Sequence, residues 1–303
     1  MMEKIRLGRT NLIVTRSSFG ALPIQRVSFD EAKKLLLKAY DNGINFFDTA
    51  RAYSDSEEKI GYALADVRKD IIIATKSHAA NKKELFEHLE ISLKNLKTDY
   101  IDIYMPHFDD GLTPLEEIAR GLEDLVATGK VLYVGLANFP AWKAAAIAAT
   151  MPVTALQIEY NLTQRTAERE LIGMAQYFGL STMFYSPLAG GLLTGKYRKG
   201  ASGRLTISAS KDYEEDAATK TIIDELEKIA IELEASPGQI ALAWTMKKNG
   251  FPIVGARTLA HLKDGLKALD IDLSVYHIAR LDLMSAVTMG YPNDVLKTVQ
   301  KAY

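Results

Sequence analysis

The 303-residue sequence contains no cysteine. Disulfide bonds, thiolate metal sites and iron–sulfur clusters are therefore excluded, because each needs cysteine side chains. The sequence also lacks an uninterrupted run of about eighteen apolar residues, the length that a membrane-spanning helix requires. The start MMEKIRLGRTNL has no apolar segment of the kind found in secretory signals. We therefore expect a cytoplasmic protein.

An excess of charge of one sign is missing as well. The chain has 37 basic and 38 acidic residues, which are interspersed and give a formal net charge of -1. Such a balance provides no general attraction to nucleic acids or to anionic membranes, although it allows a local phosphate-binding site. We expect a small molecule as the binding partner, with no nucleic acid and no membrane.

Several cofactor and metal motifs are absent or incomplete. No G-x-G-x-x-G follows a predicted strand, so a Rossmann dinucleotide-binding fold is unsupported. Residues 190–196, GGLLTGK, match the G-x-x-x-x-G-K of a phosphate-binding loop, but Tyr197 stands where Ser or Thr would ligate magnesium. The five histidines show no H-E-x-x-H pattern or close pair, so we expect no metal site.

The order of apolar segments predicts the fold. Between Phe19 and about Leu269, short runs rich in β-branched residues alternate with longer segments of helical periodicity, which is typical of repeated βα units. Strands are predicted at residues 18–22, 44–48, 71–76, 100–106, 131–135, 155–158, 182–185 and 252–254. Eight repeats favour an α/β fold with a closed (β/α)8 TIM barrel over an open doubly wound sheet. No Pro/Gly/Ser-rich linker divides the chain, so we expect a single barrel domain over residues 1–303.

Capping signals agree with this division. Capping boxes are predicted at Ser28 with Glu31, at Thr113 with Glu116, and at Ser236 with Gln239. In the second of these, Pro114 directly follows Thr113 and is the predicted first helical residue. Gly43, Gly129 and Gly179 follow helical runs and are predicted to be left-handed C-caps.

Three segments lie outside the regular repeat. Residues 5–15, IRLGRTNLIVT, predict an N-terminal β-hairpin around the turn at Thr10 and Asn11, and we expect it to close the barrel floor. Residues 198–216 are long, polar and weakly periodic, which favours a mobile loop at the active mouth. The loop HFDDGLTP after the fourth strand is short and should leave the mouth open.

Four residues at or just after predicted strand ends have the chemistry of carbonyl reduction: Asp48, Tyr53, Lys76 and His107. The C-terminal ends of parallel barrel strands converge on one mouth, so these residues can face one substrate atom. A tyrosine with a pKa near 10 acts better as a proton donor when a nearby cation lowers that pKa, and Lys76 is the predicted cation. Asp48 would keep Lys76 charged and oriented, and His107 would position the carbonyl oxygen.

Each of these residues alone also allows a structural role. Asp48 could accept a backbone hydrogen bond at a turn, and Tyr53 could pack its ring while its hydroxyl is solvated. Lys76 could be a solvent-exposed lysine at the end of a strand. A lyase or isomerase that uses Lys76 as a Schiff-base amine is a further alternative. It requires a neutral lysine, and a charge-pairing Asp48 argues against it.

Sequence motifs around these residues resemble the aldo-keto reductase family. FDTARAYSDSEEKIGYAL is similar to the family's first signature and carries Asp48 and Tyr53, while IIIATK and YMPH resemble the strand ends that supply its lysine and histidine. The runs LEDLVATGKVLYVGLANF, QIEYN and YSPLAGGLLTGKY are also similar to family segments, so the resemblance extends from IRLGRTNL to GLKAL. It implies NAD(P)H-dependent reduction of an aldehyde or ketone, with Tyr53 as general acid.

The resemblance also implies a cofactor site. Asn138 and Gln157 would hold the nicotinamide carboxamide, and Tyr185 would stack on the nicotinamide ring, unless it serves only core packing. Ser186, Leu188 and Gly190 would lie along the pyrophosphate, and Lys196, Gly255 and Arg257 would lie near phosphate. His261 and Asp264 are expected at the adenosine end, and Gly20 and Ala21 are further expected cofactor contacts.

Lys196 and Arg257 favour NADPH, because a guanidinium fork suits the 2′-phosphate that distinguishes NADP from NAD. The chain departs from the family where His261, Asp264 and Gly265 replace its common Arg or Gln, Glu and Asn, and where Ala137 replaces a frequent serine. Gly265 has no side-chain amide to offer the adenine. NAD therefore stays open as an alternative.

The substrate pocket is less defined by the sequence. Leu22, Ile24, Arg51 and His78 follow strand ends and are predicted substrate contacts, with ordinary loop solvation as the alternative. We expect a monomer or a weak homo-oligomer. A cofactor-binding sensor or scaffold protein is the alternative function, because channel-associated β-subunits resemble these reductases.

Overall fold

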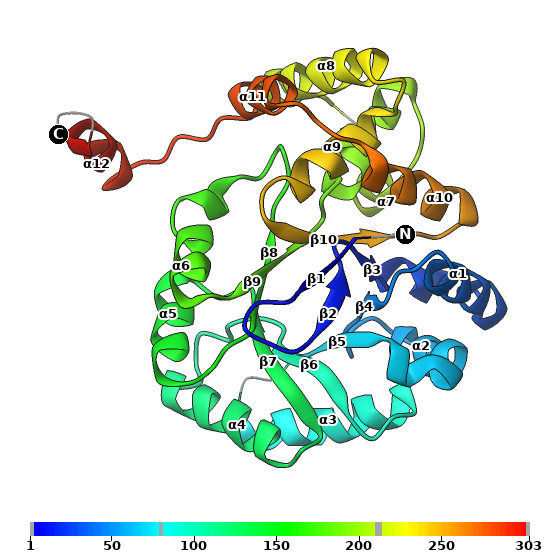
Figure 1. Cartoon of the computed structure of the whole chain (residues 1–303), viewed down its shortest axis with the longest axis vertical. Coiled ribbons are helices and arrows are strands. Elements are labelled where there is room, and N and C mark those ends of the chain that lie inside the picture. The colour runs from blue at the N-terminus through cyan, green and yellow to red at the C-terminus, as the bar shows by residue number, and fades with distance from the viewer. Residues whose placement is uncertain (1–2, 79–80, 210–213, 301–303) are drawn as a thin grey trace.

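The computed structural model describes residues 3–78, 81–209 and 214–300. Within them, eight parallel strands close into a barrel in the order β10-β3-β4-β5-β6-β7-β8-β9 (Figure 1). The strands are β3 (Ser18–Gly20), β4 (Phe46–Asp48), β5 (Ile72–Ser77), β6 (Ile101–Pro106), β7 (Val131–Ala137), β8 (Ala155–Glu159), β9 (Ser181–Tyr185) and β10 (Gly250–Gly255). The predicted (β/α)8 barrel and its predicted strands are confirmed, with small shifts of their ends.

Helices surround the barrel. They are α1 (Phe29–Asp41), α2 (Ser56–Leu64), α3 (Lys82–Leu96), α4 (Leu115–Ala127), α5 (Ala141–Thr150), α6 (Leu171–Phe178), α7 (Arg204–Ala209), α8 (Ala217–Glu232), α9 (Pro237–Met246), α10 (Leu259–Lys267), α11 (Val275–Met284) and α12 (Asn293–Gln300). Short 3-10 turns are η1 (Leu22–Arg26), η2 (Ala65–Asp70), η3 (Thr166–Glu168), η4 (Ala189–Thr194), η5 (Lys196–Lys199) and η6 (Ala268–Asp270). None of the helices in the described segments has the length and apolarity to cross a membrane.

Two of the three predicted capping boxes are confirmed, at Ser28 before α1 and at Ser236 before α9. The third prediction, at Thr113, is wrong. The Asp110 carboxylate accepts hydrogen bonds from the backbone N–H and the hydroxyl of Thr113, and α4 begins after Pro114 without a side-chain cap. The three glycine C-caps are confirmed by φ angles of 95°, 74° and 71° at Gly43, Gly129 and Gly179.

The predicted N-terminal hairpin is confirmed and covers the N-terminal end of the barrel. Its antiparallel strands are β1 (Lys4–Arg6) and β2 (Ile13–Thr15). The Thr15 N–H donates to Asn45 just before β4, and Leu7 and Val14 pack inside the barrel against Phe46. Figure 1 shows the hairpin lying across the middle of the ring of strands. The hairpin therefore closes the N-terminal end of the barrel. The C-terminal ends of the strands lie at the opposite end, which is the mouth.

Strand alternation decides which side chains point into the barrel. On β5, Ile72 and Ala74 pack in the interior cluster, whereas Ile73 packs in the outer core between strands and helices. Because side chains alternate along a strand, Lys76 shares the inward face with Ile72 and Ala74. Its position near the end of β5 places its ammonium group at the C-terminal mouth.

The polar segment at residues 198–216 differs in part from its prediction as a loop. It contains the end of η5 and helix α7, and Arg198 is bound by Glu215, Asp224 and Glu227. Residues 210–213 lie outside the described part of the chain.

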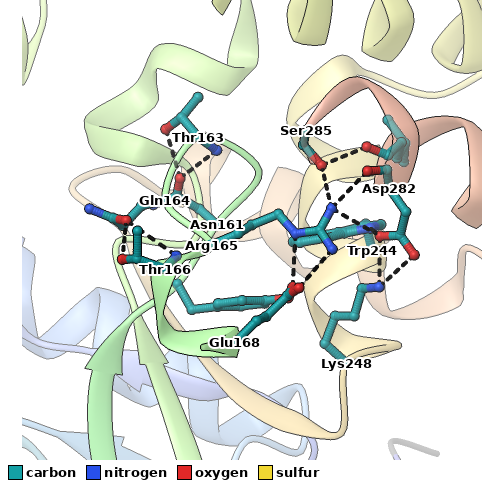
Figure 2. Close-up of polar contacts among 12 residues, drawn as sticks. Asn161, Thr163, Gln164, Arg165, Thr166, Glu168, Trp244, Lys248, Asp282 and Ser285 are labelled. Carbon is teal, nitrogen blue, oxygen red and sulfur yellow. Dashed lines mark hydrogen bonds and ion pairs between the residues drawn. The ribbon is translucent and has the colours of Figure 1, made fainter. Parts of the chain in front are cut away.

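A polar cluster joins the loop after β8 to the C-terminal helices (Figure 2). Arg165 donates to Glu168, to the Ser285 hydroxyl and to the Asp282 carbonyl, while Trp244 Nε1 donates to the Asp282 carboxylate at 2.9 Å. Arg165 is 9% exposed, so these bonds hold α11 against α9 and the β8 loop. Helix α12 follows an extended stretch (Figure 1), and Asn293 at its start donates to the Arg169 carbonyl at 3.3 Å.

Candidate active site

A buried ion pair occupies the C-terminal mouth of the barrel. Lys76 Nζ lies 2.9 and 2.8 Å from the two carboxylate oxygens of Asp48 and 2.7 Å from the Thr49 carbonyl. Lys76 is 0% exposed and Asp48 is 3% exposed. Burial lowers the pKa of Lys76, and the Asp48 carboxylate opposes that effect. Three acceptors match the three N–H groups of an ammonium, so the geometry favours a charged lysine.

Tyr53 reaches the same mouth from the turn after β4. Its N–H donates to the Ala50 carbonyl, and its ring centroid lies 5.4 Å from Lys76 Nζ. The ring meets His107 edge-on, with 5.7 Å between centroids. The ends of three strands, β4, β5 and β6, therefore bring the four predicted catalytic residues together.

The predicted lowering of the Tyr53 pKa is not what the structure gives. Burial raises the pKa of Tyr53 above its ordinary value, the Asp48 carboxylate raises it further, and Arg204 acts in the opposite direction. The reason is that Lys76 is compensated by Asp48, so the phenol faces an ion pair rather than a free cation. Tyr53 therefore keeps its proton at neutral pH, as a proton donor must.

His107 is neutral in this environment. Burial, together with the charges of Lys76 and His78, lowers the pKa of His107 to about 3. Its Nδ1 atom is buried and has no hydrogen-bond partner among the described residues. The Asn138 amide donates to the His107 carbonyl at 3.0 Å, which fixes the backbone at the end of β6. A neutral imidazole can donate one hydrogen bond to a carbonyl oxygen without bringing a positive charge.

The depressed pKa of His107 predicts an acid-side loss of stability. Between pH 6.5 and about pH 3 the unfolded chain binds a proton at His107 that the native state does not, so the free energy of unfolding falls as the pH falls. The expected slope from this group is about 1 kcal/mol per pH unit below pH 6.5. Urea unfolding at several pH values should show a shallower loss for His107→Gln than for the wild type. Equal slopes for the two proteins would contradict the prediction.

The residues implied for the nicotinamide surround this centre and bond to it. Gln157 is 2% exposed and donates to Asp48 Oδ2 at 2.8 Å. The Tyr185 hydroxyl donates to the Asn138 side-chain oxygen at 2.9 Å, and burial with the Glu159 charge raises the pKa of Tyr185 to about 12. The amides of Asn138 and Gln157 therefore each contact one of the four predicted catalytic residues, Asp48, Tyr53, Lys76 and His107, which we call the tetrad.

The segment after β9 forms a series of left-handed turns. Ser186, Ala189, Gly190 and Gly191 have φ angles of 52°, 48°, 68° and 95°. Turns of this kind point backbone N–H groups toward a common concave side, which suits a pyrophosphate. Leu188 stabilises these turns, because its carbonyl accepts hydrogen bonds from the N–H groups of Gly191 and Leu193.

Arg204 is a basic residue near this centre that the sequence analysis did not name. It begins α7, whose first residues cover Gly190, and its charge acts on Tyr53 and Tyr185. The sequence signal was a single arginine in a polar run, which gave no reason to place it at the mouth.

Basic residues gather near the start of α10. Burial lowers the pKa of His261, and the charges of Arg257 and Lys196 lower it further, so the three side chains share one region. One oxygen of the Asp264 carboxylate, a predicted adenosine contact, accepts a hydrogen bond from Gln239 at 2.6 Å. A side chain at Gly265 would contact Val254, with a Cβ at 3.0 Å from it.

The ends of β3 and β10 approach each other closely. Gly20 pairs with Gly255 in register, and a Cβ on Gly20 would lie 2.7 Å from the Ile253 side chain. Ala21 is fully buried and its N–H donates to the Asp48 carbonyl, so its backbone is tied to the tetrad strand.

The predicted substrate residues divide into two groups. His78 is exposed with its ring 5.3 Å from His107, and Leu22 is half-buried at the start of η1. Ile24 instead is 0% exposed and packs in the outer core, which leaves it no surface for a substrate. Arg51 is half-buried, its N–H donates to the Lys76 carbonyl, and its charge acts on His88 and Tyr104, so its contact with substrate stays a prediction.

The sequence pattern of the aldo/keto reductase family matches residues 16–286. The chain belongs to the aldo/keto reductase family. It is similar to an uncharacterized oxidoreductase of Bacillus subtilis (strain 168), with 35% identity over 305 residues that cover 90% of this chain and 92% of that protein. An aryl-alcohol dehydrogenase (NADP(+)) of Phanerodontia chrysosporium is 34% identical over 297 residues, covering 86% and 77%. A probable voltage-gated potassium channel subunit beta of Oryza sativa subsp. japonica is 32% identical over 302 residues, covering 89% and 92%.

Membership of this family supports an oxidoreductase activity. Groups of three or more His, Asp or Glu side chains that could hold a metal ion are absent from the described segments.

Proposed function

We propose that this aldo-keto reductase is an NADPH-dependent carbonyl reductase. Bound NADPH supplies the hydride. Tyr53 donates the proton to the carbonyl oxygen, His107 orients that oxygen by a hydrogen bond, and the Lys76–Asp48 pair sets the field at the phenol. The observation that carries the proposal is the fully buried Lys76–Asp48 pair beneath the Tyr53 ring, with His107 at the ring edge.

The residues at the mouth fit a nicotinamide cofactor. Gln157 and Asn138 present amides beside the tetrad, the Tyr185 ring lies at the end of β9, and left-handed turns follow it. Lys196 and Arg257 supply positive charge for phosphate beside a neutral His261, and we propose that Arg204 adds positive charge from α7. This set favours NADPH over NADH, because the 2′-phosphate gains charge-assisted bonds. The NADP named for the P. chrysosporium relative agrees with this preference.

Fluorescence titrations with NADPH and NADH test the cofactor preference. Arg257→Ala should weaken NADPH binding by about tenfold and leave NADH binding nearly unchanged, because a charge-assisted hydrogen bond contributes roughly 1.5–3 kcal/mol. Lys199→Ala is the matched control, since Lys199 is exposed. If Arg257→Ala weakened NADPH binding and NADH binding equally, the proposed contact of Arg257 with the 2′-phosphate would be contradicted. A panel of aldehydes and ketones, offered to the NADPH complex, then tests the reaction class.

The Schiff-base alternative for Lys76 is weak. The lysine nitrogen already donates to two carboxylate oxygens and a carbonyl, and it is 0% exposed. An amine that attacks a carbonyl needs a free lone pair and access to its substrate. Both requirements argue against a lyase or isomerase.

A cofactor-binding sensor or scaffold is the second candidate. Three relatives named as probable or putative potassium channel β subunits, at 31–33% identity over 87% or more of this chain, favour it. Tight NADPH binding without reduction across the carbonyl panel would select this function. We place the expected activity in a single barrel domain that acts as a monomer or weak homo-oligomer in the cytoplasm.

A further inference from the structure

Asn161 is a buried polar residue that the proposed reaction leaves unassigned. It belongs to the QIEYN run, follows β8 by two residues and is 1% exposed. Its side-chain amide bridges two loops. The Nδ2 atom donates to the Ser186 carbonyl at 3.0 Å, and the Oδ1 atom accepts from the N–H and the hydroxyl of Thr163 at 2.9 and 2.8 Å.

The orientation of this amide is fixed. Because Thr163 offers two donors to Oδ1, the NH₂ group must face the Ser186 carbonyl. The Asn161 backbone pairs in both directions with Gln164, which holds the residue in a tight turn. Figure 2 shows Asn161 and Thr163 beside the Arg165 cluster that ties this loop to α11. The bridge therefore rests on a rigid support rather than on a free loop.

The Ser186 carbonyl, which accepts the bond from Asn161, belongs to the residue after Tyr185, the proposed stacking residue for the nicotinamide. Ser186 has a φ of 52°, a left-handed conformation that residues other than glycine adopt at a cost, so its neighbours must hold it there. Its carbonyl also accepts from the Ala189 N–H at 2.8 Å. The preceding residue is Tyr185, and its hydroxyl is held at the other end by Asn138. The Tyr185 ring is thus fixed between Asn138 at its tip and the Asn161-bound turn at its base.

We propose that Asn161 is a positioning residue for the nicotinamide half of the cofactor. By holding the Ser186 carbonyl, it sets the plane of the Tyr185 ring on which the nicotinamide stacks. The inference rests on the proposed function for the identity of the cofactor. It does not depend on turnover, since it concerns the binding of one half of the dinucleotide.

The test separates the two halves of the cofactor. NADPH, reduced nicotinamide mononucleotide and 2′,5′-ADP are titrated in turn against the wild type, Asn161→Asp and Asn161→Ala. Asn161→Asp keeps the acceptor oxygen for the two Thr163 donors and loses the donor to Ser186, whereas Asn161→Ala loses both the acceptor and the donor. Gln164→Glu is the matched control, because it makes the same amide-to-acid change in the same loop, and its side chain bonds only Thr166 within the described residues.

Both Asn161 variants should weaken NADPH and the mononucleotide by about tenfold, the effect of one buried hydrogen bond with its lost positioning. Binding of 2′,5′-ADP should stay within about twofold, as the adenosine end lies on other elements. Gln164→Glu should leave all three affinities unchanged. Thermal melting of each variant without cofactor accompanies the titrations.

Three results would overturn the positioning role. One is unchanged NADPH affinity in both Asn161 variants. Another is equal weakening of 2′,5′-ADP and the mononucleotide, which indicates a general structural defect. The third is a wild type that binds neither NADPH nor NADH, which would overturn the proposed function as well. If the wild type binds NADPH but reduces no carbonyl, the proposed reaction is contradicted, whereas the role of Asn161 in cofactor binding is still decided by the fragment titrations.

Discussion

Tyr53→Phe should lower kcat by about a thousandfold, since a positioned general acid contributes roughly 10²–10⁴ to the rate. The phenyl ring keeps the edge contact with His107 and the position above Lys76, so the proton is the main loss. The Tyr53 hydroxyl makes no hydrogen bond within the described segments, so removing it should leave the free energy of unfolding nearly unchanged. Steady-state kinetics with an aldehyde and NADPH measure the effect.

The cofactor titration separates chemistry from binding in this variant. NADPH affinity should stay within about twofold of the wild type, because removing one proton donor does not remove stacking or phosphate contacts. Tyr177→Phe is the control, as Tyr177 is 81% exposed on α6. Turnover by Tyr53→Phe at the wild-type rate would end the assignment of Tyr53 as the acid.

Lys76→Met should cost both activity and stability. It leaves the Asp48 carboxylate 3% exposed with only Gln157 as a side-chain donor within the described residues, and breaking a buried pair in this way costs about 3–5 kcal/mol. The field at the phenol also changes from that of an ion pair to that of an anion, which raises the pKa of Tyr53 further and weakens it as an acid. Chemical unfolding and kcat measure the two effects separately.

A double variant distinguishes the two causes. Asp48→Asn with Lys76→Met removes both charges, so most of the lost stability should return because no buried charge is left without a partner. The activity should not return, since no ammonium group remains near Tyr53. A double variant that regained both would show that Lys76 acts on folding alone.

The predicted site could be assembled from the sequence because its residues follow strand ends. A strand end is visible as the last β-branched residue of an apolar run, and parallel closure brings such ends together. Asp48, Tyr53, Lys76 and His107 were found in this way and lie around one mouth in the structure. The same logic failed for Ile24, because position after a strand does not determine which side of the barrel wall a loop side chain faces.

The sequence by itself determined the number of strands, the hairpin, two capping boxes and the candidate chemistry, because periodicity, capping and residue type are local properties. The tertiary structure decided the raised pKa of Tyr53, the position of Arg204 next to Gly190 and the hydrogen bond from Asn161 to the Ser186 carbonyl. Each of these depends on burial or on contacts between segments distant in sequence. Such distances and solvent exclusion exist only once the barrel has closed.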